Sequence, residues 1–258
     1  MLNLQKPITM QSNINPKRDL PLLQDDDNYF GAVGQQYLSK SSAGALLGDV
    51  RQFLVKSEDN INFELGSYFH HLLIEPEKAS IKHLVNTKTR NNKVYRDYIA
   101  EHQIPFAVLE IEKILIDNLA AAMLAIPLFE QIIYDIDNQY EVAGVKKING
   151  FWWKGKADIV ATDKVYDLKT TVNLDKFRYS AKTYHYDLQA YLYREIFGKD
   201  MVFLVACKKT ATCGIFECSD EFYNSGEHKA ERAVQQYHKY YGENATHDPN
   251  LYYIKSQL

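Results

Sequence analysis

The amino-acid sequence predicts an α/β fold in which helices flank a central mixed β-sheet. Apolar residues recur at helical spacing through the first half of the chain, up to Pro127. Three short runs typical of β-strands follow, and a helix, two strands and a last helix come after them. This order of helices and strands is typical of one sheet covered by helices.

Three helices are expected before the strands. Ser39-Lys40-Ser41 offers an N-cap for the first helix, which would include the apolar residues spaced along 45–54. Residues 64–74 form the second helix, and residues 107–126 form the third, with Pro127 as terminator. The third helix carries a stripe of apolar residues at helical spacing: Ile111, Ile114, Leu115, Leu119, Ala122, Met123 and Ile126.

The expected strands are short segments of β-type sequence. They are residues 140–148, 151–161, 164–169, 201–207 and 213–218. The first three strands follow one another closely and predict a meander. A helix at about residues 183–197 separates the third strand from the fourth, and an amphipathic helix from roughly 220 to 241 ends the pattern.

We expect a single domain over residues 29–258, because no linker rich in Pro, Gly or Ser interrupts this part. Residues 1–28 are polar, contain three prolines and end in Asp25-Asp26-Asp27, which predicts a flexible N-terminal arm. The last segment, His247 to Leu258, has two open interpretations, a docking tail or a loose end.

Composition argues against several classes of protein. The net charge of −3 does not fit a polybasic protein that coats nucleic acid. The sequence lacks a signal peptide and a run of roughly 18 apolar residues, so we expect a cytoplasmic protein with no membrane contact. Cys207, Cys213 and Cys218 are expected to be reduced thiols, because an iron–sulfur cluster normally needs four thiolates.

One basic strip is a candidate for binding nucleic acid. Residues 82–96 contain lysines and arginines but no acid. Four of these cations are the DNA contacts that we expect: Lys88, Arg90, Lys93 and Arg96. A solvated loop and helix face is the alternative interpretation of the same residues.

The candidate chemical centre lies in KGKADIVATDKVYDLKTT, residues 154–171. If Asp163-Lys164 is the two-residue turn of a hairpin, Asp158 faces Lys169 across the strand pair. Cross-strand partners point to the same side, as do residues two apart in one strand, so Asp158, Asp167 and Lys169 would converge. A three-residue loop would move Asp158 to the opposite face, which ties the prediction to the register.

These three side chains suit the hydrolysis of a phosphodiester bond. Two carboxylates can hold Mg²⁺ through oxygen, and the cation can lower the pKa of a bound water and offset charge on the phosphate. A lysine at this position can orient or deprotonate that water, and the carbonyl of Leu168 offers a further metal ligand. The alternative is an exposed hairpin with an Asp–Lys pair, which adds little stability.

Several motifs in order resemble the PD-(D/E)xK nuclease superfamily, in its RecB-like and RecE-like branch, which includes exonuclease VIII and phage relatives. Asp158 followed by Asp167-Leu168-Lys169-Thr170-Thr171 is similar to the D…DLKTT core of that branch. Gly66 to His70 resembles its GxxxH helix, and residues 72–76 (LLIEP) resemble its LLLEP segment. Gln189 to Tyr193 resembles its QxxxY helix.

The resemblance implies a restriction-endonuclease-like core and a role for each matching residue. His70 would be a metal ligand beside the two aspartates, and imidazole favours Mn²⁺ over Mg²⁺. Its neighbour His71 is the competing candidate. Glu141 would bind a second metal ion or orient a water. Gln189 and Tyr193, four apart on one helix, would hold the lysine or a DNA phosphate, or bridge the helix to the sheet.

The function that the resemblance implies is a metal-dependent DNA exonuclease that uses Mg²⁺ or Mn²⁺ on linear DNA, in phage-type recombination or DNA processing. The resemblance covers roughly residues 37–240. The expected partner is DNA, as linear duplex ends or a single strand, and a single-strand annealing protein and a homo-oligomer are open as further partners. Two alternatives remain: a structure-specific or single-strand endonuclease of the same superfamily, and a non-catalytic DNA-end-binding protein. The sequence contains no GxxxxGK[ST] motif, so we expect no ATP-driven motor.

Overall fold

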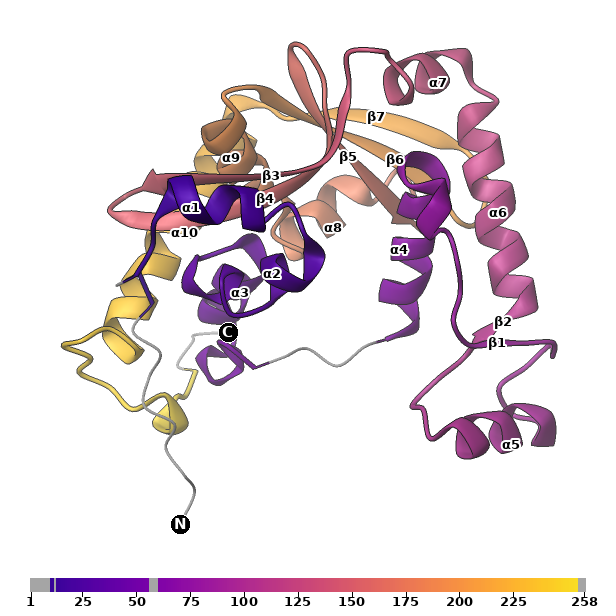
Figure 1. Ribbon diagram of the computed structural model, residues 1–258, viewed down its shortest axis with the longest axis horizontal. Coiled ribbons are helices and arrows are strands. Elements are labelled where there is room, and N and C mark those ends of the chain that lie inside the picture. The colour runs from indigo at the N-terminus through magenta and orange to yellow at the C-terminus, as the bar shows by residue number, and fades with distance from the viewer. Residues whose placement is uncertain (1–9, 12, 56–59, 255–258) are drawn as a thin grey trace.

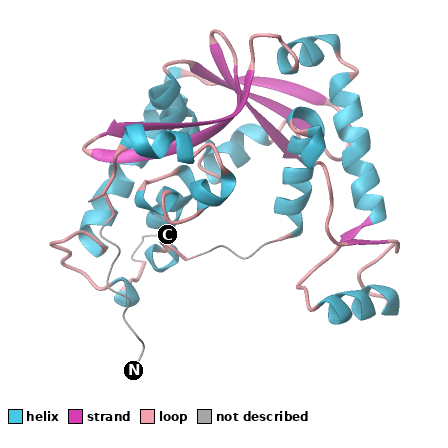
Figure 2. Ribbon diagram, viewed as in Figure 1, coloured by secondary structure: helices cyan, strands magenta, loops and turns pink. Residues whose placement is uncertain are grey.

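A five-stranded mixed β-sheet forms the centre of the computed structural model, which describes residues 10–11, 13–55 and 60–254. Its strands, in spatial order, are β3 (Gln139–Ile148), β4 (Phe151–Val160), β5 (Lys164–Thr171), β6 (Asp200–Cys207) and β7 (Cys213–Glu217). β5 and β6 run parallel, and the other neighbours are antiparallel. The predicted mixed sheet is therefore confirmed (Figure 2).

Helices surround this sheet (Figure 1). Those in the described residues are α1 (Pro16–Leu22), α2 (Asp26–Phe30), α3 (Lys40–Leu47), α4 (Ile61–Ile74), α5 (Lys93–His102), α6 (Glu110–Leu124), α7 (Pro127–Ile133), α8 (Phe177–Thr183), α9 (Tyr186–Phe197) and α10 (Asp220–Tyr240). A separate parallel pair, β1 (Leu84–Val85) and β2 (Val108–Leu109), lies beside α5 and away from the main sheet. The described part of the chain contains no helix with the length and apolar content that a membrane span requires.

Two hydrophobic cores lie on opposite faces of the sheet. Leu168 and Leu204 pack with α4 and α6 on one face. Val165 and Phe203 pack with α9 and α10 on the other face. Alternate residues of β5 and β6 enter different cores, and β6 is buried over all of its residues except Asp200, as expected for the parallel part of a sheet. This confirms the predicted α/β class with helices flanking the sheet.

The first predicted helix begins where expected and ends early. Ser39 caps α3 with a capping box, in which Ser39 and Ser42 each accept the other's backbone N–H. Gly48 follows the last helical residue, and the Asp49 side chain then starts a 3₁₀ turn over Val50–Gln52 by accepting from the N–H of Arg51. The prediction of helix through 45–54 was therefore too long, because glycine and a new cap interrupt it.

The third predicted helix buries a different face from the predicted stripe. Ile111, Ile114 and Leu115 are 59%, 50% and 43% exposed. The face that packs against α4 and β6 consists of Ile116, Leu119, Ala120 and Met123. The stripe prediction was correct for Leu119 and Met123 and wrong for its exposed residues, because neighbouring elements, and not apolar spacing alone, determine the buried face. The exposed residues of the predicted stripe are Ile111, Ile114, Leu115 and Ile126. Pro127 is the first residue of α7, so it begins a helix as well as ending the previous segment.

Most other boundaries agree with the predicted ones within three residues. α4 begins at Ile61, with the Asn60 side chain as N-cap, and α9 begins at Tyr186. The short helices α5 and α8 were not predicted as separate elements. The cysteines in the described residues are free thiols.

The turn between β4 and β5 lies one residue earlier than predicted. Thr162-Asp163 forms the turn, and the N–H of Ala161 donates to the carbonyl of Lys164 at 3.0 Å. Val160 therefore faces Val165, and the predicted pairing of Asp158 with Lys169 was wrong by two residues. A two-residue shift preserves the face on which each side chain lies, so the predicted convergence does not depend on this error.

The N-terminal segment contains two helices that pack on β3. Leu23 and Tyr29 join a small core with Ala143 of β3. The Gln24 side chain accepts from the N–H of Ala143 at 3.0 Å and donates to its carbonyl at 3.2 Å. α1 and the start of α2 thus fold against the sheet although we expected residues 1–28 to form a flexible arm, because long-range contacts that local composition does not reveal hold them. The domain division at residue 28 stays a prediction.

Candidate active site

Three carboxylates lie level with one another on three adjacent strands. The residues on either side of Glu141 on β3 face those on either side of Asp158 on β4, so these two residues lie opposite each other. Between β4 and β5, Ile159 faces Tyr166, and continuing this register by one residue places Asp158 level with Asp167. The paired ladder ends at Ile159 and Tyr166, and the charge of Asp167 raises the pKa of Asp158, so these two carboxylates lie close to each other.

The backbone of Glu141 is strained. Its φ of 51° is in the left-handed region, which costs a residue with a side chain on the order of 1 kcal/mol. This conformation interrupts the β3–β4 ladder at Glu141. Ligand atoms of Glu141, His70 and Asp158 all lie within 4.8 Å of one another. The strained residue is therefore part of a cluster of groups that can bind a metal ion.

His70 reaches the sheet from α4. Its Nε2 lies 2.7 Å from the carbonyl oxygen of Leu168, and its Nδ1 lies 3.3 Å from Oδ2 of Asp158. The same Oδ2 accepts the N–H of Leu168 at 2.7 Å. His70, Asp158 and the peptide of Leu168 therefore form one connected unit. The carbonyl of Leu168 lies beside the imidazole, where the sequence predicted a further metal ligand.

Asp167 is almost completely buried between two partners. Its Oδ1 accepts from Nε2 of Gln189 at 2.5 Å, and its Oδ2 forms an ion pair with the ammonium group of Lys169. Tyr193, one turn further along α9, donates its hydroxyl to the carbonyl of Lys156 at 2.5 Å. Gln189 and Tyr193 thus bridge α9 to the sheet, which is one of the predicted alternatives, but Gln189 holds Asp167 and not the lysine.

The centre is crowded with negative charge. Burial and the charge of Asp167 raise the pKa of Asp158 well above its usual range. Burial and the charge of Asp158 raise the pKa of Glu141 to about 7. Burial alone would lower the pKa of Lys169, but the charges of Asp167 and Asp158 raise it above the ordinary value. The ammonium group of Lys169 therefore lies among carboxylates that repel one another.

This cluster suits a hard divalent cation. Carboxylate and carbonyl oxygens with one imidazole are ligands that Mg²⁺ and Mn²⁺ accept. A cation would also relieve the repulsion that raises the pKa values of Glu141 and Asp158. Both oxygens of Asp167 contact Gln189 and Lys169, and the ligand atoms that lie within 4.8 Å of one another come from His70, Glu141 and Asp158. The ligand roles themselves stay predictions.

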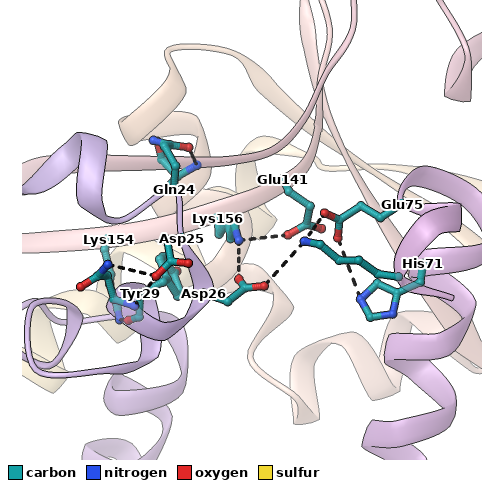
Figure 3. Close-up of polar contacts among 12 residues, drawn as sticks. Gln24, Asp25, Asp26, Tyr29, His71, Glu75, Glu141, Lys154 and Lys156 are labelled. Carbon is teal, nitrogen blue, oxygen red and sulfur yellow. Dashed lines mark hydrogen bonds and ion pairs between the residues drawn. The ribbon is translucent and has the colours of Figure 1, made fainter. Parts of the chain in front are cut away.

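The sequence did not single out Lys156, which lies beside Glu141. Its ammonium group is 3.6 Å from Oε2 of Glu141 and 2.5 Å from Oδ1 of Asp26 on α2 (Figure 3). Asp26 also lies 3.9 Å from the ammonium group of Lys78. Lys156 precedes Asp158 by two positions on one strand, and that spacing was the signal that could have indicated it. Asp26, near the N-terminus of the chain, therefore lies at the edge of the carboxylate cluster.

His71, the competing candidate for a metal ligand, faces a different partner. Its Nε2 lies 3.9 Å from Oε2 of Glu75, four residues later on the chain (Figure 3). Glu75 is in turn paired with Lys78 at 2.5 Å. His71 is therefore engaged at the end of α4, and His70 alone of the two enters the metal-ligand cluster in the described residues.

The predicted basic strip lies apart from this centre. Lys93 and Arg96 are on α5, at the periphery of the molecule and away from β4 and β5 (Figure 1). The guanidinium group of Arg90 donates to both carboxylate oxygens of Glu112, at 2.8 and 2.6 Å. Lys88 precedes α5 and is exposed. The structure does not bring these cations to the carboxylates, and their contact with DNA stays a prediction.

Comparison with known proteins places the fold. A family model described as "PDDEXK-like domain of unknown function (DUF3799)" matches residues 39–249. A crystal structure named "Putative exonuclease", from Eubacterium rectale, has a TM-score of 0.56 and 16% identity, and the match covers 82% of this chain and 85% of that one. At this identity the likeness shows a shared fold. The crystal structure of SSO0001 has a TM-score of 0.33 and 14% identity, with 76% and 85% covered, and supports no argument. A search of curated proteins found no match.

Proposed function

The chain belongs to the family of PDDEXK-like domains, which have a nuclease fold, and from this premise we propose that it is a metal-dependent exonuclease acting on linear DNA. The observation that supports this proposal is the row formed by Glu141, Asp158 and Asp167 on adjacent strands, with Lys169 and His70 against it. A solvated hairpin would leave these groups exposed, whereas here Asp158 and Asp167 are 8% and 1% exposed. Burying several charged groups is costly and is typical of a functional site.

We propose that His70, Glu141, Asp158 and the carbonyl of Leu168 hold Mg²⁺ or Mn²⁺, with Asp167 beside them. When bound, the cation would supply an activated water and offset negative charge on the phosphate. The imidazole makes Mn²⁺ a suitable alternative to Mg²⁺. The strained backbone of Glu141 turns its carboxylate to this cluster, which supports a role for this residue.

Lys169 acts as a positive charge and not as a base. The charges of Asp167 and Asp158 raise the pKa of Lys169 in spite of burial, which favours the ammonium form of this side chain. A protonated lysine can orient the attacking water and stabilise charge on the phosphate oxygens, but it cannot take a proton. Of the two roles open from the sequence, orientation is therefore the one we propose.

Gln189 and Tyr193 are positioning residues in this scheme. Gln189 holds one oxygen of Asp167, which leaves the other to pair with Lys169. Tyr193 fixes β4 next to Asp158 through the carbonyl of Lys156. Both side chains are buried, so their orientation is set by packing and not by solvent.

The exonuclease assignment rests on two likenesses. The D…DLKTT segment and the helices around it resemble the RecE-like exonucleases, and the fold is shared with a structure named "Putative exonuclease". We propose that the activity serves phage-type recombination or DNA processing, in which a digested end leaves single-stranded DNA for an annealing protein. A homo-oligomer would keep such an enzyme on its substrate.

The test compares linear duplex DNA with covalently closed circular duplex DNA, each incubated with the purified protein and Mg²⁺ or Mn²⁺. The linear DNA carries a label at its 5′ or its 3′ end. Asp167→Asn removes a central carboxylate with little change of shape. Asp163→Asn is the matched control, because Asp163 lies in the turn of the same hairpin and outside the centre.

Loss of linear DNA alone, abolished by Asp167→Asn and retained by Asp163→Asn, is the expected result. The end label that is released first gives the polarity of digestion. Cutting of the circle would replace the exonuclease proposal with the endonuclease alternative. Binding of DNA ends without cutting in either metal would contradict catalysis and favour an end-binding protein.

A further inference from the structure

We propose that a cationic and aromatic surface beside the active centre binds single-stranded DNA that enters or leaves that centre. The strand-binding surface, as we call it, consists of Lys40, Tyr179, Lys182, Tyr184, Lys229 and Arg232. This inference rests on the proposed DNA nuclease function and specifies where the strand runs. The inference places the single-stranded DNA on a different part of the molecule from the basic strip at residues 82–96.

The surface is continuous with the centre through Tyr186. The ammonium group of Lys169 lies 5.1 Å from the centroid of the Tyr186 ring, and that of Lys40 lies 5.3 Å from it. Two cations thus share one aromatic ring. Burial and the charge of Lys169 lower the pKa of Lys40 to about 8. Among the described residues no carboxylate is within ion-pair distance of Lys40, so a phosphate would supply its missing counter-charge.

The corner between α8 and α9 extends this line of cations. His185, with a φ of 56°, turns the chain there and packs near Gly44 of α3. Burial and the charge of Lys229 lower the pKa of His185, and Lys40 and Arg232 act in the same direction while Asp187 opposes them. Cations from α3 and α10 therefore surround one corner, although they are far apart in the sequence.

A groove between α8 and α10 lies at the far end of the surface. Lys182 lines it from α8, and Lys229 and Arg232 line it from α10, together with the acid Glu221. The ammonium group of Lys229 forms an ion pair with the buried carboxylate of Asp187, 2.7 Å from its Oδ1. Lys182 and Arg232 are exposed, and within the part of the chain that the structure describes neither has a carboxylate partner. These two side chains are the cations available for phosphates.

Exposed tyrosines next to the cations favour a single strand. Tyr179 and Tyr184 are 61% and 60% exposed, and Arg178 lies 4.9 Å from the centroid of the Tyr179 ring. A single strand offers base faces to such rings, whereas in a duplex the bases are stacked on one another. Basic grooves with exposed aromatic residues are typical of single-strand binding proteins. Charge complementarity and the two rings therefore indicate single-stranded DNA as the occupant.

The test measures binding without cleavage. A fluorescent thymidine oligonucleotide is titrated with the full chain in EDTA, and anisotropy is recorded over a range of salt concentrations. Lys182→Gln combined with Arg232→Gln removes the two free cations, and Tyr184→Ala removes one ring. The controls are Lys17→Gln combined with Lys147→Gln, which removes two exposed lysines on α1 and β3, and Tyr253→Ala, which removes an exposed tyrosine of the C-terminal segment.

The double variant is expected to weaken binding roughly tenfold, and the slope of log K against log salt should shrink by about 1.4, because each phosphate contact contributes about 0.7. Tyr184→Ala should weaken binding at least about fivefold. The controls should bind like the parent protein, and circular dichroism should show that all variants are folded.

Unchanged oligonucleotide binding in both test variants would overturn the inference. Weaker binding of duplex and oligonucleotide alike in the double variant, with no effect of Tyr184→Ala, would overturn the assignment to a single strand. Failure of the proposed nuclease function is a separate result. In that case the parent protein would cut no DNA, but the same variants would still lose oligonucleotide binding.

Discussion

Glu141→Gln should change how the stability of the protein depends on pH. Glu141 lies opposite Asp158, and burial and the charge of Asp158 raise the pKa of Glu141 from 4.5 to about 7. A raised pKa in the folded state means that the folded protein binds this proton more tightly than the unfolded chain does. The stability linked to Glu141 is therefore complete below about pH 4.5 and is lost as the pH rises to about 7.

The size of the effect follows from the shift. One pKa unit corresponds to about 1.4 kcal/mol. The Glu141 side chain is 24% exposed, so solvent screens part of the repulsion, and we expect on the order of 2 kcal/mol. The glutamine that replaces Glu141 cannot lose a proton. The free energy of unfolding of the variant relative to the parent should therefore rise by this amount between about pH 5 and about pH 8.

Urea unfolding followed by circular dichroism, in EDTA, measures this difference at each pH. Glu217→Gln, an exposed glutamate on β7, is the matched control and should track the parent at every pH. Adding Mn²⁺ near pH 8 should stabilise the parent more than the Glu141→Gln variant, because the variant lacks one proposed ligand. Parallel pH profiles for the parent and the variant would refute the reasoning about Glu141.

Further substitutions examine Lys169 and Gln189, which contact Asp167, and Tyr193, which donates to the backbone of β4. Lys169→Met should lower the free energy of unfolding, measured in urea, by about 3 kcal/mol, because it leaves a buried carboxylate unpaired. Adding Asp167→Asn to this variant should recover most of the loss. Purely additive effects of the two substitutions would contradict the pairing. Gln189→Leu should lower the free energy of unfolding by about 1–3 kcal/mol and slow cleavage at least about tenfold, because one oxygen of Asp167 loses its hydrogen-bond donor. An unchanged single-turnover rate of cleavage would exclude a positioning role for Gln189. Tyr193→Phe should lower the free energy of unfolding by about 1 kcal/mol, because it removes one hydrogen bond to the backbone of β4. Thermal or urea unfolding measures this change, and the cleavage rate should stay within about threefold of the parent rate. A much larger loss of rate at normal stability would give Tyr193 a role in the chemistry.

Much of the fold could be predicted because local signals coincide with the elements. Ser39 and Asn60 cap helices with their own side chains, and the strands of the meander are bounded by turn residues. Such interactions span a few residues and are visible in the sequence. The buried face of α6 is different, because it depends on where α4 and β6 lie. Apolar spacing alone therefore included Ile111 and Ile114, which are exposed.

The residues of the candidate site could be predicted from the sequence, but the hydrogen bonds and ion pairs that hold them could not. The predicted alternation of side chains along this hairpin is the same whether the turn is at 162–163 or at 163–164, because the two registers differ by an even number of residues. Which residue holds Asp167 is a different matter. Gln189 comes to it from α9, and that contact depends on how the helix packs across the sheet. Asp26 likewise reaches Lys156 only because α2 folds on β3.

The rate at which the Asp158→Asn variant cleaves DNA tests most directly the claim that the carboxylate row is the catalytic centre. Asp158 lies between Glu141 and Asp167, so this nearly isosteric change removes the middle carboxylate of the row. End-labelled linear duplex DNA is cut in Mn²⁺ under single-turnover conditions by the parent, by Asp158→Asn and by the control Asp163→Asn. We expect Asp158→Asn to lower the rate roughly 100-fold or more, because the proposed metal ion loses a ligand, and the control to retain the rate of the parent. A rate for folded Asp158→Asn within a few-fold of the parent would contradict the assignment of this row as the catalytic centre.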